Sequence, residues 1–179
     1  MLYLIHGNIP TEEHTIDKSD WPEGPWRSEA DIYAYFDDET GYPCMVMRHG
    51  HMGTLNGYVG IPDDHPCFGV DHDDMPDSID VYGGLTFSSL LETPNKLGRE
   101  VHWFGFDCAH HGDMMPGVEA LLNRATAKDK VMMNGCQKTA WRGPRAAYRD
   151  IDFVKNEVRR LARQLKDQQW LPAEAEPPA

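Results

Sequence analysis

The sequence predicts an α+β fold: a single domain with a mainly antiparallel sheet of about four to six strands and a long C-terminal amphipathic helix packed on it. Short runs of β-branched and aromatic residues, separated by turns rich in glycine, proline and aspartate, extend to residue 106. A long stripe of helical period follows at 151–165. A chain of 179 residues fits one domain and can bury a substantial core.

Residues 1–41 are expected to form an acidic, aromatic-containing irregular arm that packs on the domain. Pro22, Gly24 and Pro25 interrupt this arm, but its tryptophans and tyrosines are unusual for a disordered tail. Within the arm, 32–36 has the composition of a short strand. The core domain then covers 42–169. Residues 170–179, rich in proline, alanine and glutamate, are expected to be a disordered tail.

Three strands are expected at the start of the core domain. Segments 42–48 and 54–61 are β-prone and lie five residues apart, with two glycines between them, which predicts an antiparallel hairpin. Segment 79–88 predicts a third strand. Its Gly83 and Gly84 would either form a bulge or let another backbone or a ligand approach closely.

A further strand is expected within 99–113, followed by a short helix over 117–124 and then by the long helix. Asp150 can cap the N-terminus of the long helix, and Pro172 is expected to stop it. The apolar residues of this helix step by three and four, as one buried face requires. They are Ile151, Val154, Val158, Leu161 and Leu165.

The charge of the chain is strongly acidic and unevenly distributed. Aspartate and glutamate number 29 against 17 lysines and arginines, a formal charge of −12, which argues against general nucleic-acid binding. Between residues 49 and 95 there are eight acidic residues and no lysine or arginine, whereas 124–167 has 12 basic residues and five acidic ones. These two regions either complement each other in the fold or lie on separate solvated faces.

The cysteines and the N-terminus predict a cytoplasmic protein. Cys44, Cys67, Cys108 and Cys136 are widely spaced and form no C-x-x-C pair, as expected of reduced thiols. No secretion signal is expected at the N-terminal segment, because it lacks a basic start and a long apolar stretch. No apolar run reaches transmembrane length, so no membrane association is expected.

The segment 99–113, REVHWFGFDCAHHGD, places polar chemistry directly after an apolar, aromatic strand. Asp107, His110 and Asp113 are the candidate catalytic residues, because a helical turn lets side chains three apart converge, and His111 would then point to solvent. With His65 from the acidic loop, they are also candidate ligands for one divalent metal ion, namely zinc, manganese or magnesium. Alternatively, the aspartates cap turns and the histidine lies on the surface or in the core.

A second group of residues predicts ligand capture. Flat aromatic side chains can stack on a base, guanidinium groups can bind phosphate, and glycines let a ligand approach the backbone. For the tryptophans the alternative is an ordinary place in the core. The candidate ligand-binding residues are Trp103, Trp141, Arg142, Arg145, Arg149, Gly83 and Gly84.

The runs GYPCMVMRH, LNGYVGIPDDHPCFG, DVYGGLTFS, VHWFGFDCAHHGD and YRDIDFVKNEVRRLARQL occur in this order along the chain. The ordered set resembles a family of uncharacterised accessory proteins of tailed bacteriophages and prophages, over about residues 24–165. The resemblance implies the cytoplasm of a host bacterium and an action on host defence or nucleotide metabolism. That family pattern usually has histidine where this chain has Tyr82. A site that depended on this histidine would be impaired here, or would use Tyr82 or His102 instead.

Two functions remain open from the sequence. The first is a phage-encoded cytoplasmic accessory protein, with anti-defence as one role, whose His/Asp pocket binds a small phosphorylated nucleotide-like ligand. If it also hydrolyses this ligand, it is a metal-dependent hydrolase or phosphodiesterase. The second is an acidic protein inhibitor that blocks a basic surface of a host protein, such as a host defence protein.

Overall fold

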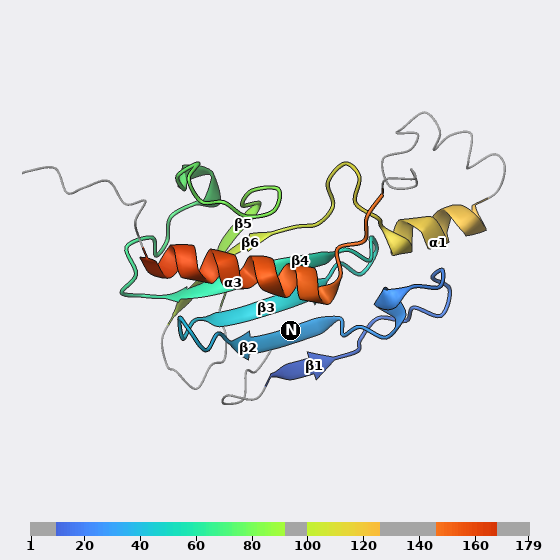
Figure 1. Ribbon diagram of the computed structural model, residues 1–179, viewed down its shortest axis with the longest axis horizontal. Helices are drawn as coiled ribbons and strands as arrows, with labels where there is room; N and C mark the ends of the chain where they lie inside the picture. Colours follow the sequence, from blue (N-terminus) through green and yellow to red (C-terminus); the bar gives the residue numbers. More distant parts are fainter. Residues whose placement is uncertain (1–9, 92–99, 126–145, 168–179) are drawn as a thin grey trace, which may run out of the picture.

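The computed structural model describes residues 10–91, 100–125 and 146–167, in which one sheet lies beside two α-helices (Figure 1). The sheet has six strands in the order β1-β2-β3-β4-β6-β5, and every neighbouring pair is antiparallel. This confirms the predicted fold class. The strands are β1 (Thr11–Glu13), β2 (Ile32–Phe36), β3 (Pro43–Arg48), β4 (Leu55–Pro62), β5 (Phe87–Leu91) and β6 (Val101–Phe106).

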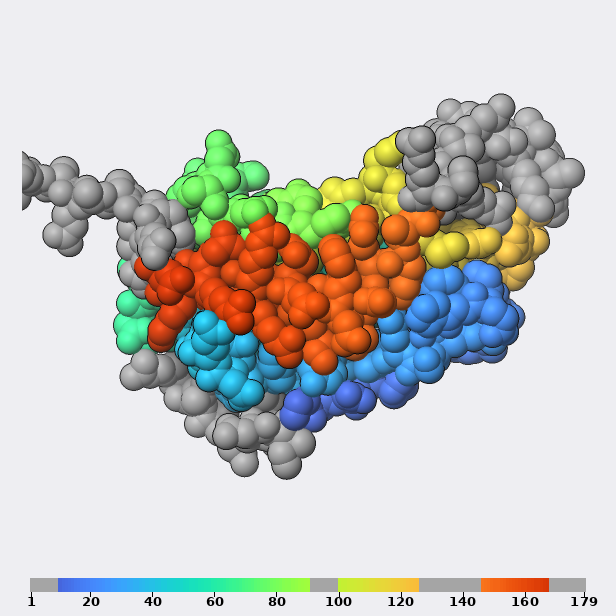
Figure 2. Space-filling view, in the orientation of Figure 1, coloured from blue at the N-terminus to red at the C-terminus, as the bar shows by residue number. Residues whose placement is uncertain are grey.

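The two helices take different positions relative to the sheet. Helix α1 (Pro116–Arg124) lies beyond one end of the sheet, and α3 (Ile151–Asp167) crosses one of its faces (Figure 1). In the space-filling view, α3 runs between the N-terminal segments in blue and the loop between β4 and β5 in green (Figure 2). The long helix therefore covers the centre of that face.

Helix α3 forms and packs as its sequence pattern predicts. Asp150 caps it, because its Oδ1 accepts a hydrogen bond from Phe153 N at 2.8 Å. Four residues of the apolar stripe are completely buried, and each contributes about 1.5–3 kcal/mol through burial. They are Val154, Val158, Leu161 and Leu165. The predicted stop at Pro172 lies outside the described residues.

Gly57 in β4 lets α3 approach the sheet closely. A Cβ atom at this position would lie 2.5 Å from the Phe106 ring and 2.6 Å from a methyl group of Val158. Both neighbours are fully enclosed core side chains, so neither has room to move away. The absence of a side chain at Gly57 is thus a condition of the helix–sheet contact.

The face of the sheet opposite α3 is also apolar. Its buried cluster is separate from the main core and consists of Ile32, Ala34, Met45, Tyr58, Val101 and Trp103. All six residues of β6 are buried, which explains why this strand shows no alternation of apolar and polar residues.

The hairpin prediction is confirmed, but the third predicted strand is wrong in position. Strands β3 and β4 pair antiparallel, and 32–36 coincides with β2. Residues 79–86, by contrast, lie outside the sheet, and the strand begins only at Phe87. Ile79 and Val81 alternate because they pack into the core, and the chain then turns, with Gly84 N donating to Val81 O at 3.0 Å. The alternation of apolar and polar residues at 79–82 thus reflects burial of every second side chain and not pairing with a neighbouring strand.

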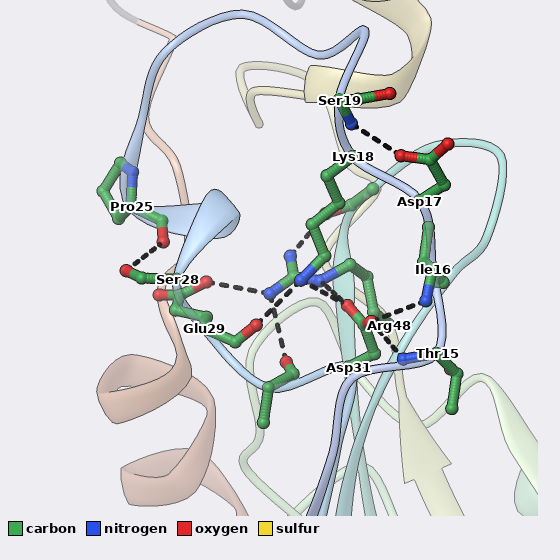
Figure 3. A network of polar contacts seen from close by, with 12 residues as sticks. Thr15, Ile16, Asp17, Lys18, Ser19, Pro25, Ser28, Glu29, Asp31 and Arg48 are labelled. Atoms are coloured by element: carbon green, nitrogen blue, oxygen red, sulfur yellow. Dashed lines mark hydrogen bonds and ion pairs between the residues drawn. The ribbon is translucent and has the colours of Figure 1, made fainter.

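Residues 10–41 contribute β1, β2 and the short 3-10 helix Pro25–Arg27, and a buried polar network anchors them to β3 (Figure 3). At its centre, Arg48 donates through Nε to Asp31 Oδ1 and through Nη2 to Glu29 Oε2, both at 2.9 Å. Lys18 Nζ pairs with Asp31 Oδ1 at 2.6 Å. The segment expected to be an irregular arm is therefore joined to the same sheet as the hairpin.

The loop between β4 and β5 displays the acidic residues that the sequence concentrates there. Seven aspartates of this loop are exposed: Asp63, Asp64, Asp71, Asp73, Asp74, Asp77 and Asp80. Cys67, Met75 and Ile79 are buried in the core and fasten the loop to the domain. In the described parts of the chain, no helix is long and apolar enough to cross a membrane. The expected C-terminal tail, 170–179, lies outside them.

Candidate functional site

The chain turns sharply after β6, and this turn gathers the three candidate catalytic side chains. Asp113 N donates to His110 O, and His110 N donates to Asp113 Oδ2, each at 3.0 Å. The imidazole Nδ1 of His110 lies 3.6 Å from Asp113 Oδ2 and 3.9 Å from Asp107 Oδ1. The D-x-x-H-x-x-D spacing therefore places His110 between two carboxylates, while His111 is exposed.

Asp113 is the buried centre of this turn, with 1% of its surface exposed. Its Oδ1 accepts hydrogen bonds from Tyr82 OH at 2.7 Å and from Arg149 Nε at 3.0 Å. A parallel bridge between Asp113 and Ala147 brings the segment before α3 alongside the turn. These partners allow the carboxylate to be buried, because an unpaired buried charge is strongly unfavourable.

Arg149 is held in place but not enclosed. Its side chain is 29% exposed, and its guanidinium carbon lies 4.8 Å from the centre of the Tyr82 ring and 5.0 Å from that of Phe153. Partial burial acts to lower the pKa of Arg149, but hydrogen bonds with Tyr82 and Asp113 outweigh it and raise this pKa. Among the described residues, neither Nη1 nor Nη2 has a hydrogen-bond partner. A permanent cation thus keeps its terminal nitrogens available.

Tyr82 connects the turn to α3. Its backbone N donates to Glu157 Oε2 at 2.9 Å, and its ring makes edge-on contacts with His110 and Phe153, with centroids 5.4 and 5.2 Å apart. Burial, followed by the hydrogen bond to Asp113, raises the pKa of Tyr82. The phenol therefore stays protonated and acts as a donor to Asp113.

Gly83 and Gly84 lie beside this cluster, both with positive φ, at 72° and 86°. A Cβ atom on Gly83 would lie 2.1 Å from Cε1 of His110, so no side chain fits there. On Gly84 a Cβ atom would meet nothing within 4 Å, so only the backbone conformation favours glycine. The group that comes close to Gly83 is the ring of His110, not the backbone or ligand that the sequence suggested, and the glycine pair forms no bulge because it lies outside the sheet.

A cavity of about 300 Å³ opens next to the turn, between β4, β6 and the start of β5. Tyr58, which lines it, belongs to the apolar cluster on the face opposite α3. The polar and aromatic residues of its wall include His49, Thr54, Asn56, Tyr58, Phe87 and Asp107. No lysine or arginine belongs to the described wall of this cavity.

Asp107 belongs both to the cavity and to the turn. Its side chain is 32% exposed, and its Oδ1 accepts a hydrogen bond from Ala109 N at 2.9 Å while lying 3.9 Å from His110 Nδ1. Its Oδ2 accepts no hydrogen bond from the residues that the structure describes. A partly exposed carboxylate of this kind can accept a hydrogen bond or a proton from a ligand or from water.

The remaining predicted histidine ligand lies elsewhere. His65 is buried at the C-terminal end of α3, where its Nε2 is 2.8 Å from Leu165 O, whereas the turn lies at the N-terminal end of this helix. His102, the other histidine considered, is buried with its Nε2 at 3.0 Å from Val70 O, and burial lowers its pKa. The structure therefore brings neither His65 nor His102 to the turn.

The predicted aromatic and basic ligand-binding residues do not come together at one site among the described residues. Trp103 is 2% exposed and packs in the apolar cluster opposite α3, so its ring is a core side chain. Trp141, Arg142 and Arg145 lie outside the described residues. Of the three arginines proposed for phosphate, only Arg149 is thus located, and it lies at the turn.

Of the four predicted metal ligands, Asp107 and His110 lie at the turn with partly exposed side chains that could still bind an ion. Both oxygens of Asp113 already accept hydrogen bonds, and Arg149 balances its charge. Within residues 10–91, 100–125 and 146–167, the only three His, Cys, Asp or Glu side chains close enough to share an ion are Asp71, His72 and Asp73. Asp71 caps a short 3-10 helix at the surface, and His72 and Asp73 begin it; exposed acidic groups of this kind are common without a metal.

Sequence reasoning did not select the cavity residues Thr54, Asn56 and Tyr58. A signal for them exists in the hairpin, because alternation along β4 places residues 54, 56 and 58 on one face. The pairing of Gly57 with Phe106 then puts Asn56 next to Asp107 on the neighbouring strand. Finding the site this way requires the β4–β6 register, which the sequence does not provide. Cys108, next to Asp107, is buried, and burial raises the pKa of its thiol.

Comparison with known proteins adds little to this geometry. No protein-family model matches the chain, and no solved structure matches it. A stretch of 80 residues, 44% of the chain, is 32% identical to a 1,3-beta-galactosyl-N-acetylhexosamine phosphorylase of Bifidobacterium longum subsp. longum. The match spans 11% of the length of that phosphorylase, so it does not show membership of its family.

Proposed function

We propose that this chain is a phage-encoded accessory protein that binds a small phosphorylated, nucleotide-like ligand at the turn after β6. The observation that carries the proposal is Arg149, whose Nε is fixed by Asp113 and Tyr82 while its terminal nitrogens have no partner among the described residues, at a partly exposed position. Phosphate oxygens are the usual partners of such nitrogens. His110, whose side chain is 33% exposed, supplies a further polar group beside them.

The charges around Arg149 limit the kind of phosphate that fits. Asp107, Asp113 and Glu157 all contact the cluster, so its carboxylates outnumber its guanidinium group. A triphosphate would be repelled here, because like charges at contact distance are unfavourable even when partly screened. The ligand that suits the site is therefore a monophosphate or a phosphodiester.

Hydrolysis of the ligand is the second part of this proposal. Asp107 would accept a proton from water, and the resulting hydroxide would attack phosphorus while Arg149 stabilises the negative charge. His110 in its protonated form would return a proton to the leaving oxygen. Asp107 and His110 are also the residues that would bind a divalent ion at this turn.

The biological setting in this proposal has a different origin. The resemblance of the ordered sequence runs to a phage family supports expression in the cytoplasm of an infected bacterium and an anti-defence role. The matched phosphorylase is named for a galactosyl hexosamine substrate. Sugars are therefore a necessary comparison in any test of nucleotide binding.

A thermal-shift experiment tests the proposal. The full chain is heated with nucleoside monophosphates and dinucleotides, and metal content is measured on the same preparation. Ligand at 100 times its Kd stabilises a protein by about 2.7 kcal/mol, which is readily detected. Arg149→Gln should reduce the shift sharply, whereas the control Arg163→Gln, at an exposed ion pair near the far end of α3, should retain it. No shift with any nucleotide would overturn the proposal.

The exposed acidic loop supports a second candidate, an acidic inhibitor that covers a basic surface of a host protein. Its carboxylates are displayed on a segment fastened to the core, so they form a defined surface. Replacing Asp71, Asp73, Asp74 and Asp77 with asparagine should then abolish capture of a host protein from lysate. Capture that survives these four changes but is lost in His110→Ala would exclude this candidate.

A further inference from the structure

Two polar side-chain atoms of the cavity wall have no hydrogen-bond partner among the described residues. Thr54 is 2% exposed, and its Oγ1 is buried without a hydrogen bond to any described residue. The same holds for Oδ1 of Asn56, two residues further along β4. A buried polar group without a hydrogen bond destabilises a protein by about 1–3 kcal/mol. Two such groups at one cavity indicate a place where a ligand completes the bonds.

The wall has a defined pattern of acceptors and donors. Asp107 Oδ2, directly after β6, and Asn56 Oδ1, on β4, are neighbouring acceptors, since the register pairs Gly57 with Phe106. Tyr58 OH accepts from Asn56 Nδ2 at 3.3 Å, which leaves its own proton to donate. Burial, which outweighs the bond from Asn56, raises the pKa of Tyr58 and keeps that proton in place.

This pattern excludes a bare phosphate and favours hydroxyl groups. The cavity has a carboxylate and no lysine or arginine in its described wall, so an anion would be repelled. Hydroxyl groups can donate to the carboxylate and the amide oxygen, and accept from Thr54 and Tyr58. The ring of Phe87, which packs against the apolar cluster on this face, provides an apolar surface for C–H groups. At about 300 Å³, the cavity is at the small end of ligand pockets, which suits a single ring.

We propose that this cavity binds the vicinal diol of a sugar ring, with Asp107 and Asn56 accepting from its two hydroxyl groups. Asp107 lies 3.9 Å from His110, which in turn lies beside the Asp113–Arg149 pair, so the cavity wall shares Asp107 with the turn that holds the cationic group. A ligand that occupies both has a sugar next to a phosphate, as a ribonucleotide does. The choice of ribose rests on the proposed function, whereas diol binding rests on the cavity alone.

Calorimetry with paired ligands tests the inference on the full chain. The 5′-monophosphates of adenosine, guanosine, cytidine and uridine are compared with their 2′,3′-dideoxy counterparts, and with free ribose and galactose. The dideoxy ligands should bind at least tenfold more weakly to the wild-type protein. Asp107→Asn should remove this difference. Arg149→Gln should weaken both members of a pair equally and preserve their ratio, while Arg163→Gln should change neither.

Thr54→Val provides an independent readout, because valine has nearly the same shape as threonine without the hydroxyl group. If Oγ1 has no partner in the free protein, this change should leave the melting temperature equal or higher while lowering affinity for the diol ligands severalfold. A lower melting temperature with unchanged affinity would mean that Thr54 has a structural partner, and would overturn its role here.

The possible outcomes separate this inference from the proposed function. Equal binding of ribonucleotides and dideoxynucleotides, still dependent on Arg149, would overturn the diol site and leave the phosphate site standing. Binding of free ribose or galactose that depends on Asp107 and gains nothing from a phosphate would support the diol site and overturn the phosphate site. No binding of any of these ligands would overturn both.

Discussion

Two polar clusters built from the same residue types, an arginine, an aspartate and a tyrosine, differ sharply in exposure. In the first, the side chains of Arg48 and Asp31 are 0% and 1% exposed. In the second, Asp113 is as deeply buried, but Arg149 is 29% exposed. Consecutive residues serve the two clusters, because Tyr148 bonds to Arg48 and the next residue bonds to Asp113.

The two clusters differ in how many N–H groups of the arginine remain without a hydrogen bond. Arg48 uses all five of its N–H groups, on Asp31, Glu29, Tyr148 and two backbone carbonyls. Toward the residues that the structure describes, Arg149 uses only its Nε. The closed cluster therefore has no capacity for a ligand and joins the N-terminal segments to the sheet, while the open cluster is fixed at one end and available at the other. Unused donors, more than residue type, distinguish a binding site from a structural network.

The largest expected effect comes from Arg48→Met, which leaves Asp31 and Glu29 buried without their shared cation. Breaking a buried ion pair from one side costs about 3–5 kcal/mol, so the urea midpoint should fall by a large fraction of total stability. The matched change Arg163→Met removes an exposed arginine paired with Glu39 and should leave the urea midpoint almost unchanged. Similar losses from both variants would mean that the Arg48 network is open to solvent.

Removing one hydroxyl group from each cluster compares the two directly. Tyr148→Phe deletes a group bonded to both Arg48 and Glu29, and should destabilise the fold by about 2 kcal/mol. Tyr82→Phe deletes a group bonded to Asp113 and Arg149 at a partly exposed position, and should cost about 1 kcal/mol. Chemical denaturation of both variants checks the order. A larger loss from Tyr82→Phe would show that the second cluster is primarily structural.

Whether a contact could be predicted from the sequence depends on how far apart its two residues lie along the chain. The stripe of α3 and the Asp107–Asp113 turn are local patterns, so residue spacing alone was sufficient to predict them. The partners that give the turn its chemistry, Tyr82 and Arg149, lie 31 and 36 residues from Asp113, and no local pattern links them. The same holds for the Arg48 network, since Lys18, Glu29 and Asp31 look like ordinary surface charges in the sequence.

Adjacent histidines test the orientation of the turn with a smaller effect. His110→Ala removes a ring that contacts Tyr82 and lies between two carboxylates, and should cost about 1 kcal/mol. His111→Ala alters an exposed side chain and should stay within about 0.5 kcal/mol. Denaturation curves measured side by side decide between them. An equal or larger loss from His111→Ala would mean that the turn presents the other face.

The smallest expected effect is the pH dependence of the stability that the Arg48–Asp31 cluster contributes, because this stability changes only at acid pH. Burial acts to raise the pKa of Asp31, but the bond from Lys18 and the backbone N–H groups of Ile16 and Thr15 outweigh it and lower this pKa. A carboxyl group with a depressed pKa contributes stability above its unfolded pKa of about 3.9 and loses that contribution as the pH falls through the folded value.

Lys18→Met should therefore be less stable than the wild type at pH 7, and the difference should narrow as the pH falls below about 4. The urea midpoints of the two proteins are measured from about pH 2 to about pH 7, a range in which carboxyl groups titrate. The difference between the two midpoints should shrink toward the acid end of this range. The exposed pair of Arg124 with Asp20 offers a control, because Arg124→Met removes a solvent-screened charge and should give a nearly constant, small difference. A gap between the wild type and Lys18→Met that stays constant down to pH 2 would show that Lys18 stabilises the arm by packing alone and not through the charge of Asp31.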